Sequence, residues 1–229
     1  MKALNPDVYV AQFDEQNRNP STSKLSRWIS TGSRVLEIGC ASGFFTRYLV
    51  ETKKCSVVGV EYNTDAAAIA ARWAPVHVVD IEQPGAFQDC GSSFDVIVLG
   101  DVLEHLHDPQ GTLECVKGLL SPAGVVLVSV PNIAHYSIRL SLLQGKFDYT
   151  ENGLLDRTHL RFFTMRSALR MFQQAGYYVQ DWDITMSYTY LGRFLGTRGW
   201  IYNPILALMK VWPNLFGYQL IFRITRTNH

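Results

Sequence analysis

The stretch from Val35 to Thr46 constrains the fold more than any other part of this sequence. It runs Val35-Leu36-Glu37-Ile38, then Gly39-Cys40-Ala41-Ser42-Gly43, then Phe44-Phe45-Thr46. An apolar run, a loop of small residues and a helical pattern predict a strand, a tight turn and the start of a helix. Open α/β sheets bind nucleotides at such a turn, because small residues let the backbone approach a ligand closely.

The loop resembles the first motif of class I S-adenosylmethionine (SAM)-dependent methyltransferases, E/D-x-G-x-G-x-G. Its positions are occupied by Glu37, Gly39, Ala41 and Gly43, so alanine replaces the middle glycine. Because alanine disfavours a positive φ, we expect no such backbone at this position. A dinucleotide motif G-x-G-x-x-G fits less well, since Phe44 would take the place of its last glycine. A carboxylate beside the loop also suits a sulfonium better than a pyrophosphate.

Composition agrees with an ordinary globular chain. The 229 residues include 47% apolar and 18% charged residues, which can bury one sizeable core, and we expect a single domain over 1–229. The net charge of +1 provides no electrostatic argument for a nucleic-acid partner. Without a signal sequence or an apolar run of about 20 residues, a cytoplasmic location without an integral membrane segment is expected. Four scattered cysteines indicate reduced thiols rather than zinc ligands: Cys40, Cys55, Cys90 and Cys115.

Short runs rich in valine, isoleucine and leucine alternate with helical patterns up to Pro131. Such runs indicate parallel strands that are covered on both faces of a sheet. Strands are expected at 34–38, 57–61, 76–80, 94–99 and 125–130. Helices are expected at 44–53, after a cap at Asn63 or Thr64, and around Leu113 and Val116. Ser21 or Ser23 is expected to cap an earlier helix that carries Leu25, Trp28 and Ile29.

After Pro131 the alternation becomes irregular. The sequence predicts a helix at 135–143, a polar insertion at 145–159, a helix capped by Thr164, a strand at 177–184 and a closing edge strand at 218–224. We therefore expect a doubly wound α/β fold whose seven-stranded, mostly parallel sheet ends in an antiparallel strand. An N-terminal arm and helix (1–31) would precede a SAM-binding core (32–132), and helical cap elements at 133–176 and 189–216 would lie on the acceptor side.

Glu61 lies 22 residues after Gly39, at the end of the second predicted strand. This spacing suits a carboxylate that bonds the two ribose hydroxyls of a nucleoside. A solvated carboxylate at the end of a strand is the alternative. With the loop, Cys40 and Tyr62 complete the cofactor contacts expected in this region.

The resemblance implies further cofactor contacts at the ends of the third and fourth strands. Asp80 would face the adenine amino group and Ile81 would line the ring, although Asp80 can equally act as an N-cap. Gly100, Asp101 and Val102 would approach the methionine part of SAM, with a helix cap as the other role for Asp101.

The run from Asp101 to Leu106 is similar to a segment of ubiquinone-biosynthesis O-methyltransferases and of many small-molecule methylating enzymes. Within it Glu104 can also be an exposed helical residue. His105, His107 and Asp108 can be considered as metal ligands, but two histidines that are two residues apart do not share a helix face. We therefore predict no metal site.

The segment 153–164 looks like one found in bacterial enzymes of this group, many of which act on sugars or cell-surface glycans. Its charges can simply pair with one another on a loop. They can also bind an acceptor, because insertions of this kind build acceptor pockets in such folds. Arg157 and Arg161 are the candidates for binding an anionic acceptor group.

Methyl transfer to a hydroxyl group needs a general base, and histidine is the usual base at neutral pH. His159 in the polar insertion is the first candidate, and Asp156 is expected to orient it. His105 is the second candidate. His135 is the third and is also a candidate acceptor contact.

The resemblance implies a SAM-dependent methyltransferase with S-adenosylhomocysteine as its product. Oxygen on a sugar or a similar small metabolite is the expected acceptor. A quinone or phenol O-methyltransferase, and a SAM-binding protein without catalysis, are the alternatives. The aromatic segment 189–216 can be core, a lid, a self-association surface or a peripheral membrane contact, and both a monomer and a homodimer are compatible with the sequence.

Overall fold

One seven-stranded sheet organises the computed structural model, which describes residues 20–186 and 207–227. The strands are β1 (Arg34–Ile38), β2 (Ser56–Glu61), β3 (Val76–Val78), β4 (Phe94–Gly100), β5 (Leu120–Pro131), β6 (Tyr177–Ile184) and β7 (Gln219–Arg226). Their order is β3-β2-β1-β4-β5-β7-β6, and β7 is antiparallel to both of its neighbours. The predicted fold class, mostly parallel with an antiparallel last strand, is confirmed.

The described helices are α1 (Ser21–Ser26), α2 (Phe44–Glu51), α3 (Thr64–Ala70), α4 (Pro109–Lys117), α5 (Tyr136–Leu143), α6 (Met165–Gln174) and α9 (Pro213–Phe216), with a 3₁₀ turn η2 (Leu103–His105).

Two predicted helix caps are confirmed. The Asn63 side chain accepts from the Ala66 N–H, and Thr164 forms a capping box with Ser167. These caps satisfy backbone donors that the first turn of a helix leaves free.

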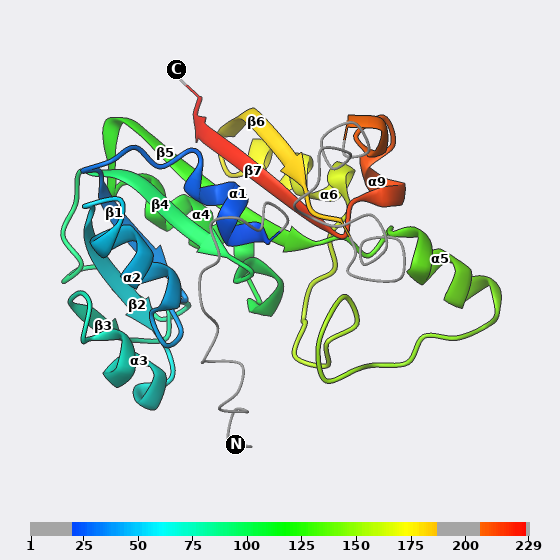
Figure 1. Ribbon diagram of the computed structural model, residues 1–229, viewed down its shortest axis with the longest axis horizontal. Coiled ribbons are helices and arrows are strands. Elements are labelled where there is room, and N and C mark those ends of the chain that lie inside the picture. Colours follow the sequence, from blue (N-terminus) through cyan, green and yellow to red (C-terminus); the bar gives the residue numbers. More distant parts are fainter. Residues whose placement is uncertain (1–19, 187–206, 228–229) are drawn as a thin grey trace.

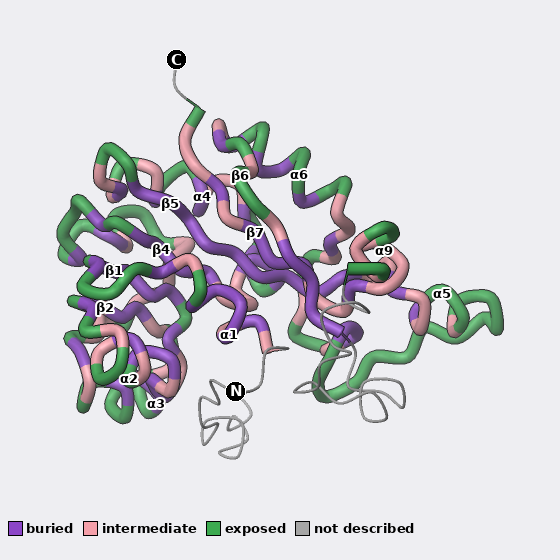
Figure 2. The backbone as a smooth tube through the Cα atoms, turned by 45° about the horizontal axis from the view of Figure 1, so that its top comes forward, coloured by how far each residue is buried: buried purple, intermediate pink, exposed green. Residues whose placement is uncertain are grey.

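Strand residues alternate between two apolar cores, one on each face of the sheet. On one face, Ile97 and Val126 join the core under α4 and α6. On the other, Val96 and Val125 join the core under α1 and α2. Figure 2 shows the resulting burial along β4, β5 and β7. Covering on both faces explains why these strands are apolar at nearly every position.

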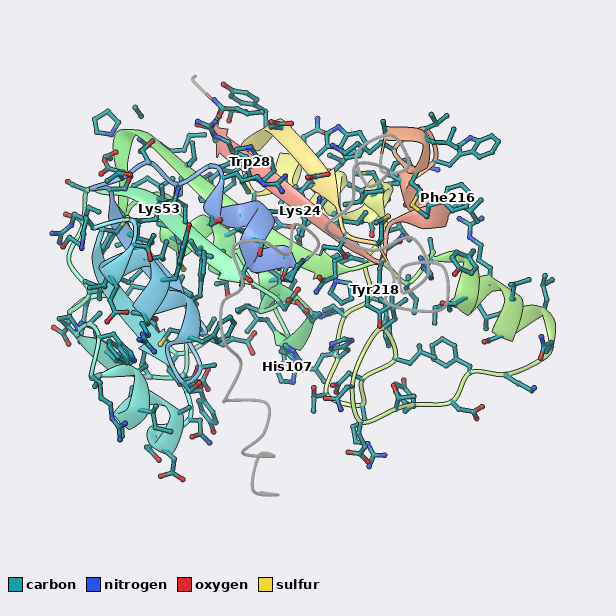
Figure 3. The ribbon with its side chains drawn as sticks, viewed as in Figure 1. Lys24, Trp28, Lys53, His107, Phe216 and Tyr218 are labelled. Atoms are coloured by element: carbon teal, nitrogen blue, oxygen red, sulfur yellow. The ribbon has the colours of Figure 1, made fainter. Side chains whose placement is uncertain are left out.

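A buried ion pair fastens α1 to the sheet. The Lys24 ammonium group, only 1% exposed, lies 2.8 Å from the Asp183 carboxylate of β6. Burial lowers the pKa of Lys24 to about 8. Figure 3 labels Lys24 on α1, which packs against β5 and β7.

The order of the strands brings three loops together. Within the sheet, β2 lies on one side of β1 and β4 lies on the other side, so the direction of strand addition reverses at β1. Such a switch point opens a crevice at the carboxyl ends of the strands. The loops 39–43, 61–63 and 100–108 all follow these ends. The loops after β1, β2 and β4 therefore lie together at the carboxyl edge of the sheet.

Three expectations about local structure are wrong. The final strand is not an edge strand, because β7 lies between β5 and β6 (Figure 1). Neither Ser21 nor Ser23 caps α1, whose N-cap is Pro20, and the helix ends at Ser26, before Trp28. The Ser21 hydroxyl instead donates to Asp101 at 3.3 Å. Tertiary hydrogen bonds have displaced local ones here.

Other expectations fall outside the described residues. The arm at 1–19 and most of the segment 189–216 are among them. Within the described parts of the chain, no helix is long and apolar enough to cross a membrane.

Candidate active site

Gly39 and Gly43 need to be glycine for two reasons. Their φ angles are +74° and +79°, in the left-handed region that side chains disfavour. A Cβ on Gly39 would lie 2.6 Å from a Val102 methyl group, and one on Gly43 would lie 2.8 Å from the Cα of Ala70. These two residues therefore let the loop pack tightly against η2 and α3.

Ala41 contradicts our expectation for the replaced glycine. Its φ is +49°, so the loop keeps the left-handed backbone that the motif's middle glycine would favour. The Ala41 N–H donates to Glu61 Oε2 at 2.8 Å. We infer that this hydrogen bond helps to hold the alanine in a conformation that costs about 1 kcal/mol.

Replacing Ala41 with glycine is expected to stabilise the ligand-free protein by up to about 1 kcal/mol, because it removes the left-handed strain. For a chain of this size the thermal midpoint should rise by about 2–4 °C. Ala68, exposed within α3, is the matched control. Its replacement by glycine should lower stability by about 1 kcal/mol. A fall in the midpoint for both variants would contradict this account of Ala41.

Both oxygens of Glu61 bind the backbone around the predicted nucleoside site. Oε2 accepts from Ala41, and Oε1 accepts from the Asn63 N–H at 2.9 Å. A carboxylate has about four lone-pair sites, so these bonds leave acceptor capacity for a ligand. Glu61 is half-buried, and Tyr62 beside it is 66% exposed.

Glu37 lies beneath the loop rather than open to it. It is 5% exposed and accepts from the Thr46 hydroxyl at 2.7 Å. Burial raises the pKa of Glu37 to about 7. Because this pKa lies above its unfolded value, the carboxyl lowers stability as pH rises from about 4.5 to about 7. The neighbouring Cys40 thiol is also buried, and burial raises its pKa strongly.

Asp80 closes a turn two residues beyond the end of β3. Its Oδ1 accepts from the Glu82 N–H at 3.0 Å, and its Oδ2 accepts from the Gln83 side chain at 3.3 Å. Asp80 therefore caps a turn rather than a regular helix. Ile81 is partly buried against the main core.

Asp101 is held by three elements of the fold. Ser129 of β5 and Gln219 of β7 donate to its carboxylate at 2.9 Å, and Ser21 of α1 also donates to it. Burial raises the pKa of Asp101 despite these hydrogen bonds. Its φ is +57°, and the residue that caps η2 is Val102. Asp101 is therefore not a helix cap, and it stands directly after Gly100 at the end of β4.

Glu104 is buried, which sequence reasoning missed. Only 1% of it is exposed, and its Oε2 has no partner among the described residues. Burial, with the nearby charges of Asp101 and Asp156, raises the pKa of Glu104 well above its usual range. The reading of Glu104 as an exposed helical residue is wrong. The apolar residues Leu103 and Leu106, which flank the pair Glu104 and His105, were the sequence signal for burial.

The structure brings His159 and His105 together. Their ring centroids are 5.0 Å apart, although the residues come from different loops. The Glu104 carbonyl accepts from Leu160 and Arg161 N–H groups at 2.8 and 2.9 Å, which docks the insertion on η2. Burial and the neighbouring His105 lower the pKa of His159. The first two candidate bases thus form one cluster with Glu104.

The ring nitrogens of this cluster have definite partners. His159 Nδ1 lies 3.4 Å from the Leu154 carbonyl, and His105 Nδ1 lies 3.2 Å from the Thr158 carbonyl. A carbonyl oxygen can only accept, so these contacts assign a proton to Nδ1 of both rings. In neutral His159 the Nε2 lone pair is then available for a proton or a cation.

The Asp156 carboxylate hydrogen-bonds to Thr158 rather than to His159. Its Oδ1 accepts from the Thr158 N–H at 2.8 Å and from the Thr158 hydroxyl at 2.7 Å. The expected orientation of His159 by this carboxylate is therefore wrong as a direct hydrogen bond. Asp156 acts on Thr158, which in turn contacts His105.

The two arginines of the insertion have partners nearby. Arg157 lies 2.6 Å from Glu151, in an exposed ion pair. Arg161 donates to the His107 carbonyl, which joins the insertion to the loop after β4. Figure 3 shows the labelled His107 beside that insertion. Both guanidinium groups have structural roles in the absence of an acceptor.

His135 caps α5 and is fully buried. Its Nδ1 accepts from the Ser137 N–H and lies 2.8 Å from the Ser137 hydroxyl. Burial lowers the pKa of His135 to about 4, so the ring is neutral at physiological pH. Nε2 therefore carries the proton, and it has no partner among the described residues. His135 packs edge-on against Tyr218, with ring centroids 5.6 Å apart.

Among the described residues, one group can hold a metal ion. A carboxylate oxygen of Glu104 and ring nitrogens of His105 and His159 all lie within 4.8 Å of one another. Two imidazoles and a carboxylate suit zinc or another divalent transition metal. We considered His105 with His107 from the sequence, and the structure assembles a different set.

Comparisons with known proteins agree with the resemblance. A family model described as a methyltransferase domain matches residues 11–181. The ubiquinone biosynthesis O-methyltransferase of Aeromonas salmonicida is 25% identical over 66% of this chain and 65% of its own length. That of Dinoroseobacter shibae is 27% identical over 73% and 66%, respectively. The chain thus spans just under two thirds of the length of these relatives.

Solved structures share the fold. A SAM-dependent methyltransferase from Archaeoglobus fulgidus superimposes with a TM-score of 0.63. Its sequence is 19% identical, and the match covers 93% of this chain and 97% of that one.

Proposed function

The chain belongs to the methyltransferase-domain family of class I SAM-dependent enzymes, and from this premise we propose that it transfers the methyl group of SAM to a hydroxyl group of a small acceptor. One observation carries the proposal. The His105 and His159 pair lies on the loop and insertion next to Asp101, at the same sheet edge as the loop 39–43 and Glu61. The proposed SAM site and the candidate bases therefore lie at the same edge of the sheet.

Each part of the cofactor has a candidate partner in this proposal. Glu61 accepts from the ribose hydroxyls, while Asp80 and Ile81 contact the adenine. Gly39, Cys40, Ala41 and Gly43 present backbone to the nucleoside. We assign Asp101 to the methionine end, where a carboxylate favours the ammonium and sulfonium groups, and Glu37 supports the loop from beneath. Gly100 and Val102 shape that end, and Tyr62 flanks the ribose.

His159 is the proposed general base. Bound SAM would supply an activated methyl group, and the electron pair of its methyl–sulfur bond would stay on sulfur as the acceptor oxygen took the methyl group. The hydroxyl proton moves to His159 Nε2, whose lone pair the contact of Nδ1 with Leu154 leaves available. The lowered pKa keeps this ring neutral, and therefore basic, at neutral pH.

The acceptor we propose is a phenol or a quinol. Aromatic rings lie next to the base, since His159 packs edge-on to Phe162 at 6.4 Å and Phe162 packs on Phe147 at 6.1 Å. Stacked and edge-on rings favour an aromatic substrate. The likeness to ubiquinone biosynthesis O-methyltransferases supports the same class. Nothing in the comparisons favours the sugar that we expected first.

An acceptor panel tests this proposal. The protein is incubated with SAM and with catechols, simple phenols or monosaccharides, and release of S-adenosylhomocysteine is measured by mass spectrometry. Catechols are expected to support turnover at least tenfold above the monosaccharides. Turnover with monosaccharides alone would contradict the acceptor class. Binding of SAM with no product from any acceptor would instead favour a non-catalytic SAM-binding protein.

A further inference from the structure

Neutral donors from three separate elements hold the Asp101 carboxylate. The Ser129 hydroxyl of β5 donates to Oδ1 at 2.9 Å, and the Ser21 hydroxyl of α1 donates to Oδ2 at 3.3 Å. The Gln219 amide of β7 donates to both oxygens, at 2.9 and 3.0 Å. In the described parts of the chain, no arginine or lysine forms an ion pair with Asp101. The carboxylate is therefore oriented without a cationic side chain to neutralise it.

Gln219 constrains this carboxylate more than the two hydroxyl groups do. Its amide nitrogen contacts both oxygens, which fixes the rotation of the carboxylate as well as its position. A carboxylate oxygen that is ionised can only accept, so the NH₂ group of Gln219, and not its carbonyl, faces Asp101. These hydrogen bonds also lower the pKa of Asp101, against the larger effect of burial, and so favour its charged form.

The backbone of Gln219 is itself fixed in the sheet. Its N–H donates to the Thr185 hydroxyl at 3.0 Å, and its carbonyl accepts from the Thr185 N–H at 3.0 Å. Gln219 also lies opposite Pro131 in the pairing of β7 with β5. Figure 3 labels Tyr218, the residue directly before Gln219, at the start of β7. The amide thus projects from a rigid strand toward the end of β4.

Of the two carboxylate oxygens, Oδ2 keeps the larger capacity for a ligand. Its contact with Ser21, at 3.3 Å, is longer than a usual O–H···O hydrogen bond. Oδ1, in contrast, has two partners at 2.9 Å. An ammonium group brings three donors and a positive charge, so it suits an ionised carboxylate whose other partners are neutral.

We propose that Gln219 is a positioning residue, which orients Asp101 to bind the ammonium group of the methionine part of the cofactor. In this role Gln219 acts through Asp101 and not on the ligand. The inference rests on the proposed function in one respect, the assignment of Asp101 to the methionine end. It involves neither the acceptor nor the base.

Calorimetric titration with two ligands tests this role. S-Adenosylhomocysteine carries the ammonium group, whereas 5′-methylthioadenosine has the same nucleoside without the amino-acid part. Gln219→Met keeps the length of the side chain and removes the amide. This variant is expected to bind S-adenosylhomocysteine roughly tenfold more weakly, because Asp101 loses a hydrogen bond to its charged group. Its affinity for 5′-methylthioadenosine should stay within about twofold of the parent, which also shows that it is folded.

A double-mutant cycle shows whether Gln219 acts through Asp101. Asp101→Asn should also weaken binding of S-adenosylhomocysteine and spare 5′-methylthioadenosine. In that background Gln219→Met should have little further effect, because the charge that Gln219 orients has been removed. Gln180→Met is the matched control, since Gln180 is an exposed glutamine on the neighbouring strand β6. It should bind both ligands as the parent does.

Three results would overturn the proposal. Equal losses of affinity for both ligands in Gln219→Met would show a purely structural role. Normal binding of S-adenosylhomocysteine by Gln219→Met, with a loss in Asp101→Asn, would leave Asp101 at the methionine end without help from Gln219. Normal binding by both variants would refute the assignment of Asp101 as well. Since no acceptor is present, failure of this proposal and failure of the proposed methyl transfer are separate outcomes.

Discussion

Replacing Glu61 with alanine is expected to weaken SAM binding by at least 100-fold in isothermal titration calorimetry. The variant loses a charged acceptor for the ribose hydroxyls, and hydrogen bonds to a charged group contribute about 1.5–3 kcal/mol each. It also frees the Ala41 and Asn63 N–H groups, which Glu61 now holds at 2.8 and 2.9 Å. The loop that would face the nucleoside then keeps only the backbone hydrogen bonds from Gly39 and Cys40 to Val60, among the contacts described, as its anchors to β2.

A nearby acid provides the control for this experiment. Asp65 is an exposed carboxylate in the first turn of α3, four residues after Glu61. Asp65→Ala removes the same charge from the same region, and its affinity for SAM should stay within threefold of the parent. The ribose assignment would be wrong if Glu61→Ala bound SAM as tightly as the parent and melted at the same temperature.

Replacing His159 with alanine is expected to lower kcat by about 10²–10⁴-fold, the usual contribution of a general base. The dissociation constant of SAM should not change, because the base contacts the acceptor and not the cofactor. His107→Ala is the matched control. That histidine is 82% exposed and lies 3.0 Å from Glu82, so its loss should leave kcat nearly unchanged.

The pH dependence of the same reaction gives a second readout. Burial and His105 lower the pKa of His159, whereas the charges of Asp156 and Asp101 raise it by a smaller amount. The active form is the neutral ring, so kcat should rise with pH through a midpoint below about 6.5 and then level off. This rising limb should be absent in His159→Ala.

Treatment with a chelator distinguishes between His159 as a general base and His159 as a metal ligand. If EDTA removed activity from the parent protein and added zinc restored it, His159 would belong to a cation site with Glu104 and His105. That result would contradict the base assignment. We expect kcat to be insensitive to EDTA.

Local patterns predicted the elements of the site well. The strand at 34–38 and the strand at 177–184 have the bounds that were expected. The caps at Asn63 and Thr164 are also as expected. These features depend on residues within a few positions of one another, through apolar periodicity and short-range hydrogen bonds.

Errors arose where a distant partner decides the local conformation. Ala41 is left-handed, and Glu61, twenty residues away, accepts its N–H. Ser21 forms no cap because its hydroxyl reaches Asp101. Glu104 is buried, and the segment directly after the insertion docks on it through the Leu160 and Arg161 N–H groups, which donate to its carbonyl. None of these partners can be read from neighbouring positions.

The sequence by itself determined the α/β fold class, the family and the crevice edge, since strand ends, small-residue loops and caps are local features. Only the tertiary structure placed β7 inside the sheet, paired His105 with His159 and enclosed Glu104 beside them. The physical reason is that docking of the insertion, and the burial that follows, depend on contacts between segments about fifty residues apart.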